Sequence, residues 1–214
     1  MNQTEETEET GETEETGETE ETAPPGDYRL LLPDGWFRIL LEPDQRDKSI
    51  DALVERQFHG IDNAPHLKEE LHRDLRRRAA KAHRSGGIEL YLSLQEVGPF
   101  TIPASLLVTL APLRHPEPLP LEALAQRFAD GGEGSVSIEE LRSGPAVRVR
   151  RLIPQGNDEE GTEPPRNSLS VEYHVPVPAR TVFLLLTFST PLEAIADAMA
   201  ELFDAIADSL TWTE

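Results

Sequence analysis

The sequence predicts an α+β fold in which helices sandwich one antiparallel β-sheet, and three observations support this class. Strand-like runs come in pairs joined by turn residues, so neighbouring strands are expected to run antiparallel. Apolar repeats of helical spacing separate these pairs along the chain. The run Val182 to Phe188 is apolar on both faces, which is typical of a central strand with helices on both sides of the sheet.

Alternation and turn residues predict eight strands. Two lie within 27–41, around the turn Pro33-Asp34-Gly35, and the others lie over 88–97, 105–112, 135–141, 146–154, 168–178 and 180–189. Helical spacing of apolar residues predicts four helices, over about 47–60, 64–85, 120–131 and 192–210. Residues 98–103 are expected to form a proline-bounded connection, and 155–167 an exposed loop.

The closing helix shows the clearest pattern, because apolar residues from Leu192 to Leu210 repeat at three- and four-residue steps. Five acids fill its opposite side and none has a basic partner four residues on: Glu193, Asp197, Glu201, Asp204 and Asp208. Two interpretations are open, a solvated face of a helix packed on the sheet or a docking surface for a basic partner. We favour the solvated face.

Residues 1–22 hold ten Glu and no Lys or Arg, which is half of the net charge of −20. No residue between Asn2 and Thr22 is apolar, so this segment has nothing to bury that would offset the entropy of ordering. We expect a disordered Glu/Thr-rich tail over 1–26 and a single α+β domain over 27–214. The tail is either a solubilising extension or an electrostatic latch on a basic surface.

Composition also limits the classes of function. An acidic body argues against nucleic-acid binding, which needs a basic face. The absence of Cys excludes disulfides and thiolate catalysis. The first residues lack the pattern of a secretory signal, and no stretch reaches about 18 apolar residues. We therefore expect no membrane insertion and a cytoplasmic location. The excess of Arg over Lys fits a GC-rich, actinobacterial genome.

Two segments carry a resemblance to a known group: LPDGWFRILL at 32–41, and 173–212 with its aliphatic strand, Phe188-Ser189-Thr190-Pro191 and a terminal helix ending near Trp212. They resemble the PsbP-like α/β/α sandwich group, which includes the photosystem II extrinsic subunit, a small Ran-binding nuclear-import protein and DcrB-like bacterial proteins. The resemblance implies non-enzymatic binding, adaptor or chaperone roles, including secretion-linked ones. It carries over no functional residue, and 47–85 is longer than the fold needs.

The sequence offers no catalytic, cofactor or metal motif. The six histidines follow no metal-ligand spacing and are expected to be scattered on the surface: His59, His66, His72, His83, His115 and His174. The segment 132–135 matches a nucleophile elbow only loosely, since no apolar strand precedes it. We therefore expect a protein that is not an enzyme and needs no cofactor.

One basic cluster stands out in this acidic chain, and it lies within twelve residues of a predicted helix. Its members are Arg73, Arg76, Arg77, Arg78, Lys81 and Arg84. Two interpretations are open: a solvated face balanced by neighbouring acids, or a surface that binds anions or an acidic partner. We favour the solvated face. On the second interpretation the acidic tail of the same chain is the nearest ligand, and it would shield this helix until a partner displaces it.

The sequence thus predicts a non-enzymatic, protein-binding domain of adaptor or chaperone type, with a secretion-associated role as one form of it and a partner that the residues do not identify. Two alternatives stay open. One is an enzyme whose site no spacing reveals, and the other is a toxin-neutralising, immunity-like protein.

Overall fold

A computed structural model describes residues 27–60, 64–97, 100–112, 120–132, 134–155 and 166–213. The strands are β1 (Asp27–Arg29), β2 (Trp36–Leu40), β3 (Gly87–Val97), β4 (Phe100–Pro112), β5 (Ser135–Leu141), β6 (Gly144–Gln155), β7 (Arg166–Pro176), β8 (Val182–Thr190) and β9 (Thr211–Thr213). The helices are α1 (Pro43–Gln57), α2 (Pro65–Arg84), α3 (Leu121–Asp130) and α4 (Ala196–Asp208), with the 3-10 turn η1 (Glu193–Ile195) before α4. The expected disorder of 1–26 and most of the expected loop over 155–167 lie outside the described residues.

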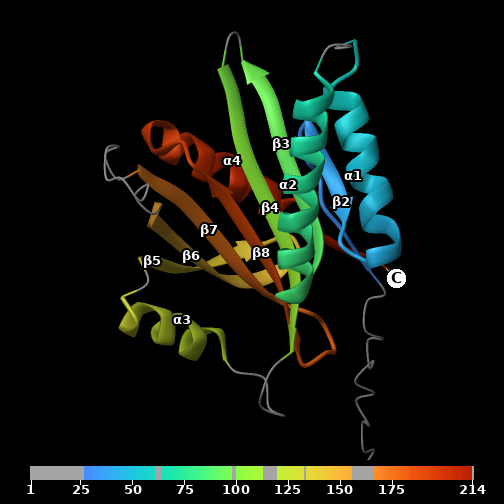
Figure 1. Cartoon of the computed structure of the whole chain (residues 1–214). Helices are drawn as coiled ribbons and strands as arrows, with labels where there is room; N and C mark the ends of the chain where they lie inside the picture. The colour runs from blue at the N-terminus through green and yellow to red at the C-terminus, as the bar shows by residue number, and fades with distance from the viewer. Residues whose placement is uncertain are drawn as a thin grey trace, which may run out of the picture.

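Seven strands form one antiparallel sheet in the order β2-β3-β4-β8-β7-β6-β5 (Figure 1). It consists of two meanders joined where β4 pairs with β8, with Leu106 opposite Phe188. The antiparallel sheet flanked by helices confirms the predicted fold class, and β8 is the central strand, as its apolar run indicates. The predicted turn before β2 is also present, with Gly35 at a φ of +87° that favours glycine.

One side of the sheet packs against α4 at its central strands (Figure 1). Alternate residues of β8, Leu184, Leu186 and Phe188, are completely buried there. The rings of Phe188 and Phe203 stack with their centroids 4.9 Å apart. Each such side chain contributes about 1.5–3 kcal/mol by leaving water. The largest buried cluster of the described residues therefore lies between α4 and strands β4, β7 and β8.

The other side of the sheet is covered only near its two ends. Helices α1 and α2 pack over β2 and β3 through a cluster that includes Ile50, Leu75 and Leu90. Helix α3 lies over β5 and β6. On β8, between these helices, Leu185, Thr187 and Ser189 stay partly exposed. The expectation that helices cover both faces of the central strand therefore holds for one face only.

Several element boundaries differ from the sequence prediction, and α1 already begins at Pro43 instead of about 47. Strand β4 begins at Phe100, so the connection expected over 98–103 is largely strand. Pro103 is tolerated because β4 has only β3 beside it there, and the pairing with β8 starts at Ser105. The closing helix is shorter than 192–210, since η1 precedes α4. Strand β9 follows it and pairs with β1, so the expected pairing of the two strands within 27–41 is wrong, and β2 pairs with β3 instead.

The acidic side of α4 is largely solvated, as favoured above, with Glu193, Asp197 and Glu201 exposed. Several of these acids also pair with other groups of the same chain, which the sequence did not indicate. Asp204 accepts two hydrogen bonds from Arg148 of β6, at 2.9 and 3.1 Å, and a third from the Tyr173 hydroxyl at 2.6 Å. Asp197 pairs with Arg150, and Asp208 with an arginine of the β5–β6 turn. Alternation along β6 points Arg148 and Arg150 at α4. Glu193 also accepts a hydrogen bond from Asn167 of β7 at 3.0 Å, so four of the five acids bind the sheet or its β5–β6 turn.

No helix in the described ranges is both long and apolar enough to span a membrane.

The unequal cover of the two faces predicts unequal costs for neighbouring substitutions on β8. We expect Leu186→Ala to lower the free energy of unfolding by about 2–5 kcal/mol, because it opens a cavity under α4. Leu185→Ala removes a half-exposed side chain of the same size and should cost roughly half of that or less. Urea denaturation of both variants measures the difference, and equal losses would contradict an open outer face.

Candidate functional site

The open part of the sheet carries polar side chains that strand register places side by side. Ser105 of β4, Ser189 of β8 and Ser170 of β7 lie in register and are named the serine row here. The hydroxyls of Ser105 and Ser189 are 2.8 Å apart and hydrogen-bonded. Ser168 precedes Ser170 by two residues and therefore points to the same side of the sheet. The middle of a sheet between two helical layers is normally apolar, so this floor is unusual.

These serines border a groove between the sheet and α2, which we call the α2 groove. Its volume is about 430 Å³. Leu71 and Leu75 of α2 line one wall, with Leu53 of α1 beside them. Ser105, Ser168 and Ser189 line the opposite side. The groove thus joins an apolar wall to a hydroxyl-bearing floor, which is the usual make-up of a binding site for a small or extended ligand.

Charged groups of α2 stand at this groove. Asp74 and Arg78 line it, and Arg78 Nε donates to Asp74 Oδ2 at 2.5 Å. Arg77 donates to the other oxygen of the same carboxylate. Two guanidinium groups therefore share one carboxylate, and the group of three carries one net positive charge. Such a charge favours an anionic ligand, although both arginines are exposed and solvent weakens the attraction.

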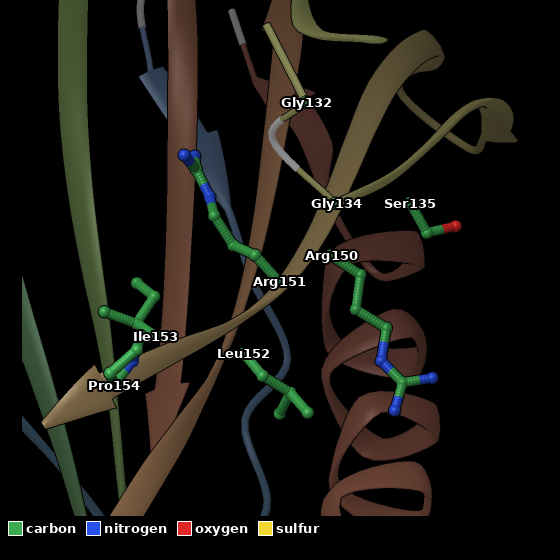
Figure 2. Close-up of a pocket in the computed structure, with 8 residues that line it drawn as sticks. All are labelled: Gly132, Gly134, Ser135, Arg150, Arg151, Leu152, Ile153 and Pro154. Carbon is green, nitrogen blue, oxygen red and sulfur yellow. The ribbon is translucent and has the colours of Figure 1, made fainter.

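At the α3 end of the open face, the Glu172 carboxylate interacts with two basic side chains. Arg151 donates to Glu172 Oε2 at 3.2 Å, and His174 Nε2 lies 2.6 Å from Oε1. Figure 2 shows Arg150 and Arg151 leaving β6 in opposite directions, with only Arg150 toward α4. Burial alone would raise the pKa of Glu172, but the hydrogen bonds and charges of His174 and Arg151 outweigh it and hold the pKa below its ordinary value.

His174 is not a surface histidine, which corrects the expectation for one of the six. Only 8% of it is exposed. Its ring lies 4.7 Å from that of Phe128 on α3 and 6.4 Å from that of Phe183 on β8. Within the described residues its contacts are with these rings and Glu172, so the structure does not pair it with a hydroxyl as nucleophilic catalysis needs. The contact of its ring with Phe128 packs α3 against the sheet.

The predicted basic cluster lies on α2, and all six side chains are exposed. Arg73 pairs with Glu69 at 3.7 Å, and Arg76 reaches Asp47 on α1 at 3.0 Å. Arg77 and Arg78 share the carboxylate described above. Lys81 and Arg84 make no ion pair with any described residue. The structure therefore brings only Arg78 to the groove, and binding of a partner by the cluster remains a prediction.

Sequence reasoning did not single out the serine row or Glu172. One signal was present, because Ser168, Ser170, Glu172 and His174 alternate along β7 and must share a face. Their neighbours Ser105 and Ser189 are distant in sequence. Only the strand order, with β8 between β4 and β7, brings these residues together.

A second hollow, of about 550 Å³, runs beside the end of β6 (Figure 2). Gly132, Gly134 and the residues from Arg150 to Pro154 line it. Because consecutive strand residues point to opposite sides, its polar groups do not converge on one point. The α2 groove is therefore the better candidate site.

Comparison with known proteins gave only distant likenesses. LpqN, involved in cell envelope biogenesis of Mycobacterium tuberculosis, has a TM-score of 0.42 and 14% identity over 87% of this chain and 83% of its own. A point mutant of the protein Mog1 has a TM-score of 0.37 and 9% identity over 59% and 79%. CyanoP, the PsbP protein of Synechocystis sp. PCC 6803, has a TM-score of 0.32 and 17% identity over 86% of this chain and 86% of its own. No protein-family model and no curated protein matches. At these values the likenesses do not assign a function.

Stability in acid should depend on Glu172. Its pKa lies below the ordinary value of 4.5, so its charged form stabilises the fold above that pH and the gain is lost as the pH falls through the lowered pKa. We expect Glu172→Gln to be less stable than wild type at neutral pH, with a difference that shrinks in acid. Urea titrations at about pH 7 and about pH 3 measure this, with the exposed Glu140→Gln as control. A difference independent of pH would contradict the ion pairs.

Proposed function

We propose that this chain is a non-enzymatic protein-binding domain, of adaptor or chaperone type, that holds its partner on the α2 side. The observation that carries the proposal is the half-open central face of the sheet beside a helix with exposed bases. A sheet that served only as a scaffold would gain stability from apolar cover at its centre. Here, polar side chains keep that centre partly hydrated, as is needed for a binding surface that is exposed to water before its partner binds.

The charge of α2 supports an acidic partner. Lys81 and Arg84 lie in its last turn without an ion pair among the described residues, and Arg77 and Arg78 share one carboxylate. Exposed pairs contribute little each, about 0.2–1 kcal/mol, but they select the sign of the partner's charge and raise the rate of encounter. The acidic body argues against nucleic acid as that partner.

The Glu/Thr-rich segment 1–22 fits the same surface by charge, since it holds ten Glu and no base. Tethering to the domain gives it an effective concentration in the millimolar range. We propose that it occupies the basic face of α2 and yields to a more strongly binding acidic partner. A cytoplasmic location, a secretion-associated role and the single domain over 27–214 belong to the same proposal.

Neutralising the two unpaired bases of α2 should weaken partner capture. We expect full-length Lys81→Gln/Arg84→Gln to retain its partner roughly three- to tenfold less than wild type in quantitative affinity purification. The control Arg29→Gln/Arg127→Gln makes the same charge change at exposed residues of β1 and α3 and should capture as wild type does. Equal loss in both variants, or in neither, would contradict the α2 surface.

A further inference from the structure

The α2 groove contains a mostly buried serine whose hydroxyl makes no hydrogen bond to a described residue. Ser168 is 8% exposed and lines the groove, and Ser170 beside it in the open face is 5% exposed. Neither hydroxyl makes a hydrogen bond to another residue in the described part of the chain. Neither oxygen is among the fully buried polar atoms that lack a partner in the described residues, so both hydroxyls reach solvent on the open face. These hydroxyls are therefore open to an occupant that accepts their hydrogen bonds in place of water.

The shape of the groove sets the other end of that occupant. Opposite Ser168, the wall is made by Leu53, Leu71 and Leu75, with Leu92 of β3 beneath. A volume of about 430 Å³ lies within the range of small-molecule sites, about 300–1,000 Å³. Water could hydrogen-bond to the hydroxyls, but it would leave the apolar surface of the leucines exposed. An apolar ligand chain would remove that surface from water, which is favourable.

The charge beside the groove selects the head group. Arg78 lines it, and the trio of Arg77, Arg78 and Asp74 has an excess of one positive charge. Glu172, a carboxylate of the open face that does not line the groove, is already engaged by Arg151 and His174. An anionic head beside Ser168 would thus meet hydroxyl donors and Arg78, whose partner Asp74 is shared with Arg77 outside the groove. A cationic head would meet the same excess positive charge and be repelled.

We infer that the α2 groove binds a small amphiphile with a carboxylate head and a flexible apolar chain. The head accepts hydrogen bonds from the hydroxyls of Ser105, Ser168 and Ser189 and attracts Arg78. The chain lies along Leu71 and Leu75 toward α1. The groove shares Arg78 and the open face of the sheet with the proposed partner surface, whereas Lys81 and Arg84, whose substitution tests that surface, do not line the groove. Loss of partner capture and loss of ligand binding are therefore measured on different residues.

Binding of decanoate to the full-length protein tests the inference by isothermal titration calorimetry and amide chemical-shift mapping. We expect saturable binding of one molecule per chain, with the shifts centred on Leu75, Ser168 and Ser189. Decyltrimethylammonium has the same chain length and the opposite head charge and should bind at least roughly tenfold more weakly. Equal binding of the two, no binding, or decanoate binding without saturation would overturn the inference.

Two variants assign the head group, each with a matched control. Ser168→Ala should weaken decanoate binding roughly tenfold, since a hydrogen bond to a charged group is lost. Ser135→Ala, at an exposed serine of β5, should change nothing. Arg78→Gln should weaken binding roughly threefold or more, whereas Arg73→Gln, on the same helix but not lining the groove, should not. Wild-type affinity in both Ser168→Ala and Arg78→Gln would overturn the inference.

Discussion

The packing of α4 against β7 and β8 is the interaction on which the rest of this structure depends. It buries Phe203 against Phe188 and closes the largest core cluster of the described residues. It is also fixed at its edges, because Arg148 and the Tyr173 hydroxyl both reach Asp204. Burial and hydrogen bonding to Asp204 raise the pKa of Tyr173, so this hydroxyl keeps its proton across the ordinary pH range. Helix α4 is thus held by apolar burial and by charge.

Because α4 supplies most of the apolar burial at the centre of the sheet, the opposite face there does not need apolar cover for the sheet to be stable. Helices α1 and α2 close one end of it through their own core, and α3 closes the other through Phe128 on His174. The strands between them carry the serine row and Glu172, which apolar packing would exclude. The groove, the hydroxyl of Ser168 and the bases of α2 all lie on or beside this face. Any binding role of the domain is therefore most simply placed there.

Much of the fold could be predicted from the sequence, because the helix and strand periods are clear. The position of β8 at the centre followed from its apolar run alone. The partners of α4's acids could not be predicted from i+4 spacing, since Arg148 and Arg150 lie about fifty residues away and meet α4 only through the sheet. The same holds for the candidate site. Of the six bases predicted to bind a partner, Arg78 alone lines the groove. The serines that line the sheet side of the groove come together only through the order of β4, β8 and β7.

The central claim is that the two faces of the central strands differ in access to solvent. The chain has no cysteine, so single cysteines report on it without background. The measurement is the rate at which a small thiol reagent modifies Thr187→Cys, on the open face, and Val171→Cys, under α4. We expect Thr187→Cys to react in the folded state and Val171→Cys to react only as fast as the chain unfolds. Equal protection of the two thiols would contradict the account.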